Sequence, residues 1–247
     1  MNIEVPYTYE LEQEYKKECV ELLEKKKQEY ADRKQKNKER AKIQTLKRIK
    51  QYKEHESNIQ NLKDLASKNN EIYVDKEPEF FLVIRIRGMN RVPPKQRKAL
   101  DLLRLRKPNT ACLMPNNHSV RQQLQVVRNY VAYGFINIHT LRQLIYKRGM
   151  TTERKVNASN VLIKKIINIS NENIEDYFNG ELVCVEDLVY HLYFGINFSK
   201  VNKFLNAFKL NCPKGGFQGK KARDVVEGGC CGNWYDKLDT LVRKMID

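Results

Sequence analysis

The side chains that most often carry out catalysis are sparse in this 247-residue chain, and none stands in a recognised catalytic pattern. The chain has four histidines, which are His55, His118, His139 and His191. They lie outside H-E-x-x-H, H-R-D and similar contexts, and no motif places a serine or cysteine beside them. The glycine pairs at 215–216 and 228–229 lack the spacings that cradle the phosphates of a bound nucleotide. We therefore interpret the histidines as surface or packed residues and predict neither catalysis nor a cofactor.

Cysteine could supply metal ligands or disulfides, but its spacing favours neither. The six cysteines are Cys19, Cys112, Cys184, Cys212, Cys230 and Cys231. No pair has the C-x-x-C spacing of structural zinc sites, and the adjacent Cys230 and Cys231 would close a strained ring if they were bonded to each other. We predict no metal site and expect most of these thiols to be small buried hydrophobic groups.

Cationic side chains, by contrast, are abundant and lie on segments that should be ordered. The chain holds 46 Lys and Arg against 30 Asp and Glu, a formal net charge of +16, which suits a polyanionic partner. Cations fixed on a folded scaffold meet phosphates at a lower ordering cost than cations on a mobile tail. The densest segment, residues 85–107, has one acid and nine basic residues, which are Arg85, Arg87, Arg91, Lys95, Arg97, Lys98, Arg104, Arg106 and Lys107.

The elements that carry these cations follow an α/β pattern. Residues 80–88 are rich in β-forming types and end in alternating apolar residues and arginines, so we expect a strand with Arg85 and Arg87 on one face. The elements expected next are a helix over 94–106, a strand over 110–114, a helix over 117–129 and a strand over 130–136. This order predicts a compact β-α-β-α-β unit whose helices cover one face of a sheet.

The C-terminal part should pack on this unit as a helical satellite. Helices are expected over 139–147, 158–167, 185–194, 201–208 and 235–246. Glu186 and Asp187 would begin one of them, where carboxylates favour the positive end of the helix dipole. Residues 209–232 are glycine-rich and basic and predict an extended loop, with the cations Lys214, Lys220, Lys221 and Arg223.

The N-terminal segment is expected to be one long helix, because residues 9–66 contain neither Gly nor Pro. Residues 1–24 carry a net charge of −5 and residues 25–53 a net charge of +10. A solvated helix or a disordered tail would explain the charges, but a basic stretch with spaced apolar residues favours an arm laid along phosphates. Its candidate contacts are Lys34, Lys38 and Lys42. We expect this arm to become ordered only against a partner.

Two further classes of protein are disfavoured. No run of about 18 apolar residues is present, so we predict no membrane-spanning helix, and the acidic N-terminus does not resemble a secretory or transit peptide. Residence in the cytosol or nucleus is expected. Helix-turn-helix, zinc-finger and RNP1-type motifs are also missing, which favours recognition of folded RNA by shape and phosphates over sequence-specific reading.

At this point several motifs resemble a known family. The run from Phe81 to Asn90, the runs 94–100 and 102–106, and the motif Leu144 to Gly149 are similar to the eukaryotic cytosolic large-subunit ribosomal protein family L-seven, kin to bacterial L-thirty. The resemblance continues through Glu186-Asp187-Leu188, Pro213 to Gly216 and Val226 to Asn233, and so extends in order from about Phe80 to the C-terminus.

The resemblance implies a ferredoxin-like split β-α-β core that binds large-subunit rRNA and has no catalytic activity. By motif match, the RNA-facing residues would be Arg85, Arg87, Lys95, Arg97, Lys98, Arg104, Arg106, Lys147, Arg148 and Lys214. The expected parts are an N-terminal extension and linker over 1–78, the rRNA-binding core over 79–137, and a C-terminal region over 138–247. Neighbouring ribosomal proteins would be the other partners, with no membrane or small-molecule ligand.

The implied function is that of a structural constituent of the cytosolic large subunit, which passes through the nucleus during assembly. One alternative is a nucleolar assembly factor of the same family. An RNA-modifying enzyme would need a cofactor loop or a metal-ligand set, and the sequence offers neither. A helical scaffold protein would depend on the first 66 residues alone.

Overall fold

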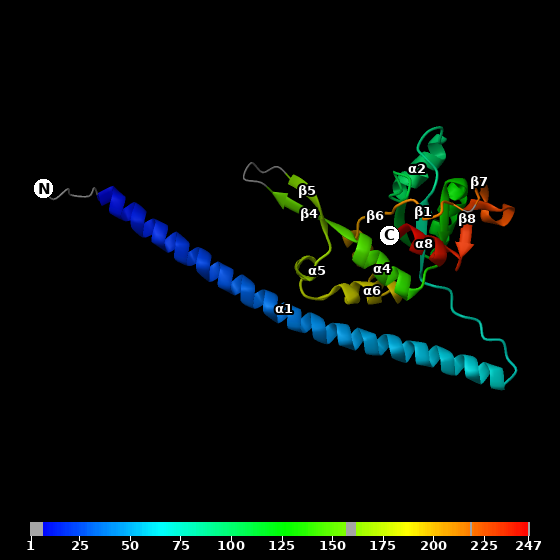
Figure 1. Cartoon of the computed structure of the whole chain (residues 1–247), viewed down its shortest axis with the longest axis horizontal. Helices are drawn as coiled ribbons and strands as arrows, with labels where there is room; N and C mark the ends of the chain where they lie inside the picture. Colours follow the sequence, from blue (N-terminus) through cyan, green and yellow to red (C-terminus); the bar gives the residue numbers. More distant parts are fainter. Residues whose placement is uncertain (1–6, 157–161, 218, 247) are drawn as a thin grey trace.

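The computed structural model describes residues 7–156, 162–217 and 219–246 and contains the expected long N-terminal helix. This helix, α1, runs from Tyr7 to Lys68 without a break. Figure 1 shows it passing beneath the rest of the fold, after which an extended segment returns to the first strand. The absence of Gly and Pro from residues 9–66 explains its continuity, and the expectation for this segment is confirmed.

A six-stranded mixed sheet in the order β6-β2-β1-β3-β8-β7 forms the centre of the molecule. Its strands are β1 (Phe80–Arg85), β2 (Thr110–Pro115), β3 (Val131–Gly134), β6 (Phe208–Lys209), β7 (Lys220–Asp224) and β8 (Gly229–Tyr235). The central strand β1 is antiparallel to both β2 and β3, whereas β8 is parallel to β3 and to β7. Since β1 separates the mutually parallel β2 and β3, the core has the expected split β-α-β arrangement.

Helices cover both faces of this sheet, although the sequence led us to expect one. They are α2 (Pro94–Leu102), α3 (His118–Val127), α4 (Ile138–Arg148), α5 (Asn171–Phe178), α6 (Val185–Tyr193), α7 (Phe198–Phe204) and α8 (Leu238–Ile246). Every residue of β1 is buried. Leu82 and Ile84 belong to the cluster that includes residues of α4, α6, α7 and α8, while Phe81 and Val83 pack in the cluster of α2 and α3.

Three local expectations for the C-terminal part were wrong. Residues 162–168 are not helical but form β5 (Leu162–Asn168), which pairs with β4 (Met150–Val156); residues 158–161 of the expected helix lie outside the described part. The β-branched isoleucines of this run suit a strand. The helix expected over 201–208 lies at Phe198–Phe204, and residues 208–209 join the sheet as β6. The expected loop 209–232 contains β7 and the start of β8.

The helix expected over 94–106 ends early, at Leu102. Arg104 adopts a left-handed backbone conformation with φ of 59°, which stops the helix, and the Leu105 amide returns to the Leu100 carbonyl. Residues 103–109 therefore form a loop that carries Arg104, Arg106 and Lys107. This early end brings the three cations to the start of β2.

Candidate nucleic-acid interface

The strand register brings several basic loops to one end of the sheet. β1 ends where β3 begins, since Arg85 lies opposite Val131, and it ends near the start of β2, since Ile84 lies opposite Ala111. The starts of β7 and β8 lie together, with Lys220 opposite Gly229. We call this region the basic end and define it as loop 86–93, helix α2, loop 103–109, segment 210–216 and strand β7.

Segment 210–216 joins the basic end through backbone hydrogen bonds. The Leu210 amide donates to the Asn109 carbonyl at 2.9 Å, and the Lys214 amide donates to the Lys244 carbonyl at 3.0 Å. Arg148, at the end of α4, donates from Nε to the Ile246 carbonyl at 2.7 Å. Three of the predicted cations, Lys147, Arg148 and Lys214, therefore lie near the C-terminal turn of α8.

Arg85 was expected to face RNA, but the structure places it inside the fold. Its side chain is only 4% exposed, and its guanidinium donates to four backbone carbonyls, those of Arg87, Gly88, Leu105 and Arg106, at 2.7 to 3.0 Å. Burial lowers the pKa of this guanidinium, opposed by the charge of Asp101. Because β1 is covered on both faces, its last side chain cannot reach solvent. Arg85 instead ties loop 86–93 to loop 103–109.

Arg104 is also engaged within the chain. Its guanidinium donates to the Asn202 and Leu205 carbonyls, both at 3.1 Å, and to Asn202 Oδ1 at 2.7 Å. Asn202 in turn donates to the Leu113 carbonyl of β2. Arg104 thus anchors loop 103–109 to α7, and the expectation that it faces RNA is not supported by its position.

The other cations of residues 85–107 lie at the surface. Arg87 is half-buried, with its guanidinium 4.9 Å from the centre of the Tyr130 ring. Arg106 is 3.7 Å from the Asp101 carboxylate and is mostly exposed. Among the described residues, no hydrogen bond or ion pair occupies the side chains of the five remaining cations, which are all exposed: Arg91, Lys95, Arg97, Lys98 and Lys107.

Strand β7 adds a second row of cations at the edge of the sheet. Lys220, Lys221 and Arg223 are all exposed, and Lys221 Nζ lies 4.7 Å from the centre of the Phe217 ring. A charged edge strand resists pairing with another sheet. The structure thus brings the cations of residues 86–107 together with those of 214–223. The sequence could not predict this proximity, because the glycine content of residues 209–232 indicated only a loop.

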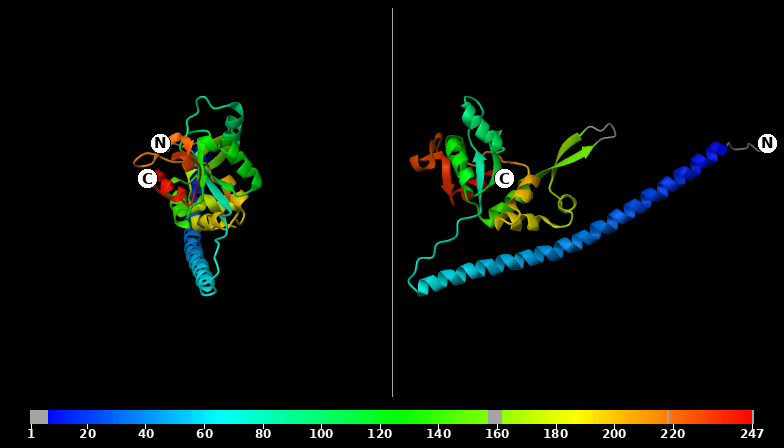
Figure 2. Two further views of the ribbon diagram at one scale, coloured as in Figure 1. Left: turned by 90° about the vertical axis from the view of Figure 1, so that its right-hand side faces the viewer. Right: turned by 180° about the vertical axis from the view of Figure 1, so that it is seen from behind.

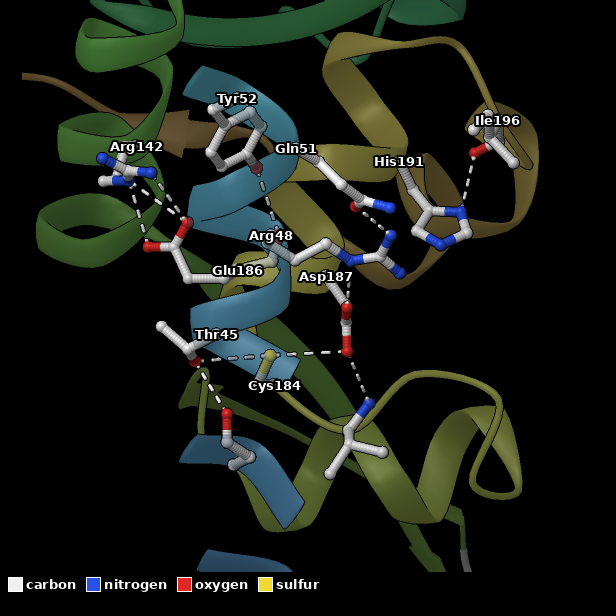
Figure 3. Close-up of polar contacts among 12 residues, drawn as sticks. Thr45, Arg48, Gln51, Tyr52, Arg142, Cys184, Glu186, Asp187, His191 and Ile196 are labelled. Carbon is white, nitrogen blue, oxygen red and sulfur yellow. Dashed lines mark hydrogen bonds and ion pairs between the residues drawn. The ribbon is translucent and has the colours of Figure 1, made fainter. Parts of the chain in front are cut away.

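The basic half of α1 does not lie at the basic end but is docked on α5 and α6. Figure 3 shows the centre of this contact, where Arg48 Nε lies 2.6 Å from Asp187 Oδ1. The Arg48 guanidinium is 4.1 Å from the centre of the Tyr190 ring. Tyr52 is buried and its ring stacks on Phe194, with centroids 6.5 Å apart. Contrary to expectation, the helix is held by the chain itself.

Closer to its N-terminus, α1 makes an electrostatic contact with α5. Arg33 pairs with Asp176 at 2.6 Å, and Arg40 with Glu175 at 3.5 Å. Lys34, a predicted RNA contact, lies 3.2 Å from Glu172, which also accepts a hydrogen bond from Tyr30. Hydrogen bonds from Tyr30 and Lys34 lower the pKa of Glu172. Of the three predicted arm cations, Lys38 and Lys42 remain exposed without a partner among the described residues.

Sequence reasoning missed the residues that hold α1. Glu186 and Asp187 were interpreted as helix-start acids, yet they are 5% and 2% exposed, and Glu186 also binds Arg142 and Tyr146. A signal was present in α1. The separations between Tyr30, Ala41, Thr45, Arg48 and Tyr52 are sums of three- and four-residue steps, which places these residues along one side of a helix.

The histidine, cysteine and acidic side chains of the described part of the chain form no further candidate site of metal chemistry. No group of three or more His, Cys, Asp or Glu side chains there could hold a metal ion. Cys112, Cys184, Cys230 and Cys231 are buried, as expected for small hydrophobic groups, whereas Cys212 is exposed. A search of the described helices also found none with the length and apolar content that a membrane span requires.

A split β-α-β sheet with exposed cations gathered at one end defines a basic α/β protein whose surface suits a polyanionic partner. Similarity to known proteins identifies the family within this class. Residues 81–131 match the family model described as ribosomal protein L30p/L7e. The chain is 38% identical to the large ribosomal subunit protein uL30 of Encephalitozoon cuniculi over 98% of both chains.

Two more relatives extend this similarity across eukaryotes. The uL30 protein of Drosophila melanogaster is 39% identical over 75% of this chain and 71% of its own. That of Candida albicans is 37% identical over 79% of both chains. The chain therefore belongs to the ribosomal protein L30p/L7e family, and the resemblance found in the sequence is confirmed.

Proposed function

We propose that this protein is a structural constituent of the large subunit of the cytosolic ribosome and that it binds folded rRNA through the basic end. The observation that carries the proposal is the set of exposed cations on loop 86–93, α2 and loop 103–109 that have no side-chain partner within the described part of the chain. Arg85 and Arg104 fix both loops by hydrogen bonds, so these cations are preorganised for phosphates. No catalytic step belongs to this role.

The proposed contact surface is the predicted set of cations without the two internal arginines. It comprises Arg87, Arg91, Lys95, Arg97, Lys98, Arg106, Lys107, Lys147, Arg148, Lys214, Lys220, Lys221 and Arg223. Lys38 and Lys42, which are exposed on α1, are proposed as a second contact, and Lys34 as a minor one. Phosphate contacts of this kind position a protein on folded RNA without reading its sequence.

We propose a separate role for each of the three predicted parts of the chain. Residues 79–137 would supply most of the rRNA contacts, residues 138–247 would buttress them and hold α1, and residues 1–78 would extend the contact away from the core. Neighbouring large-subunit proteins are the other proposed partners. The protein would enter the nucleus to join assembling subunits and then remain on cytosolic ribosomes. The relatives are named as large ribosomal subunit proteins, which favours this role over that of an assembly factor.

The test is the salt dependence of binding to purified large-subunit rRNA. Changing Arg91, Arg97 and Lys98 together to Ala should reduce the slope of log affinity against log salt by about 3, because each phosphate contact contributes about one counterion. The matched control changes Lys16, Lys17 and Lys237 to Ala, which removes the same charge away from the basic end. Equal slopes for the two triple variants would reject the basic end as the contact surface.

A further inference from the structure

The N-terminal third of α1 carries an apolar row that contacts no part of the described fold. Tyr15, Leu22 and Leu23 are 69%, 55% and 55% exposed, and Cys19 is half-exposed. Cys19 follows Tyr15 by four residues, and Leu22 and Leu23 follow Cys19 by three and four, which places them on one side of the helix. We call these four residues the distal stripe. Figure 2 shows this part of α1 projecting beyond the β4–β5 hairpin.

The distal stripe continues the side of α1 that is already an interface. Steps of three or four residues lead from Tyr15 through Leu22, Tyr30 and Ala41 to Arg48 and Tyr52. Among the described side chains, Tyr30 is the most N-terminal in α1 with a hydrogen bond to the rest of the fold. From Tyr7 to Tyr30 the helix extends about 35 Å at about 1.5 Å per residue. The intramolecular contact therefore ends near Tyr30, whereas the same side of α1 continues toward the N-terminus with the apolar residues of the distal stripe.

The charge changes sign where the intramolecular contact ends. Residues 25–53 carry a net charge of +10, but residues 1–24 carry −5. Glu14 and Glu21 flank the stripe, Glu18 stands beside it, three residues after Tyr15 and four before Leu22, and all three are exposed. An anionic segment repels phosphates. Covering an exposed apolar row with another apolar surface lowers the free energy of the system. Both features disfavour RNA and favour a protein partner.

We propose that the distal stripe is a docking site for a positively charged, apolar-bearing segment of a neighbouring large-subunit protein. The apolar row would pack against that segment, while the flanking glutamates would attract its Lys and Arg side chains. The proposal rests on the proposed function, because it needs the protein to be in the subunit. It assigns the two parts of α1 opposite partners, RNA for the basic part and protein for the acidic part.

Photo-crosslinking in purified large subunits tests this assignment. Benzoylphenylalanine replaces Tyr15 in one variant and Met89, an exposed apolar residue of loop 86–93, in another. The Tyr15 position should crosslink to a protein peptide with net positive charge, and the Met89 position to rRNA. Crosslinks from Tyr15 to RNA or to a second copy of this chain, or no crosslink at all, would overturn the docking proposal.

A second change separates specific docking from mere proximity. In the Tyr15 crosslinking variant, Leu22→Asn should reduce the protein crosslink at least tenfold. Lys17→Asn should not weaken it, because Lys17 is exposed and lies five residues before Leu22, about 140° around the helix and off the row. Equal crosslinking in the two variants would also overturn the proposal. If, in addition, the variant with benzoylphenylalanine at Met89 gives no crosslink to rRNA, the proposed function is rejected together with the docking proposal.

Discussion

Arg85 shows how the same residue type serves two purposes within a few positions of the chain. The four arginines Arg85, Arg87, Arg91 and Arg97 look alike in the sequence, but only Arg85 lies at the end of a strand that is covered on both faces. Its donors are matched by carbonyls of two loops, so it organises the surface on which other cations are displayed. The alternation of apolar residues and arginines predicted that Arg85 and Arg87 share one face of a strand, but β1 ends at Arg85 and Arg87 lies in loop 86–93.

Replacing Arg85 should therefore affect stability rather than RNA binding alone. Arg85→Ala should lower the free energy of unfolding by about 3 kcal/mol, because four backbone carbonyls, among them that of Leu105 in a buried hydrogen bond, lose their donor. Arg97→Ala, at an exposed side chain, should change it by less than about 0.5 kcal/mol. Urea unfolding of both variants measures the difference, and equal values would contradict the internal role of Arg85.

The thiols offer a second prediction at this scale. Burial raises the pKa of Cys231 to about 11, and Cys184 likewise has a pKa raised to about 11. Only about a thousandth of each is therefore the reactive thiolate at pH 8. In the native protein, an alkylating reagent should modify the exposed Cys212 first and reach Cys184 and Cys231 only after unfolding. Peptide mapping over time checks this order, and early labelling of Cys231 would refute it.

At the scale of elements, the sequence predicted what depends on local pattern and missed what depends on distant pairing. Helix α1, strands β1 to β3 and helices α3, α4 and α6 follow from periodicity and turn residues. Residues 209–232 looked like a loose loop because they are rich in glycine. Gly229 is instead required by close approach, since an added Cβ would overlap the Arg223 carbonyl of β7. No local pattern reveals a strand neighbour of that kind.

The docking of α1 should depend on its buried ion pair far more than on its exposed ones. Arg48→Ala leaves the Asp187 carboxylate buried without its cation, which should cost roughly 3–5 kcal/mol of unfolding free energy. Arg33→Ala removes an exposed pair on the same helix and should cost less than about 1 kcal/mol. Limited proteolysis within residues 40–60 should likewise accelerate only in the Arg48 variant, and equal rates would contradict this ranking.

The contact between α1 and α5 should also respond to acid. Because the pKa of Glu172 is lower in the docked state than its ordinary value of 4.5, the carboxylate stabilises docking above that pH. This contribution is lost as the pH falls through the lowered value. With Cys19 and Cys212 changed to Ser, energy transfer between dyes at Gln28→Cys and Asn179→Cys should stay constant from pH 7 to about 5 and fall below about 4.5. Glu172→Gln should reduce the fall, and an unchanged profile would reject the role of Glu172.

Viewed as a whole molecule, the chain separates two kinds of positive charge. The first kind forms ion pairs within the chain, between Arg33, Arg40 and Arg48 of α1 and acidic residues of α5 and α6. The other kind stays exposed at the basic end, where internal arginines hold the loops in place. The sequence predicted the family and most of the exposed cations, because motifs and charged residue types can be identified from the residues themselves. It could not separate exposed from internal cations, because that distinction depends on burial.

The measurement that tests the central proposal most directly is sedimentation of the tagged protein from cell lysate on a sucrose gradient. We predict that the protein stays with polysomes through a high-salt wash and moves to free large subunits when magnesium is chelated. The salt wash is needed because a chain of net charge +16 binds any RNA weakly. A protein that washes off in high salt, or that sediments only with nuclear precursors and is missing from polysomes, would contradict its role as a constituent of the large subunit.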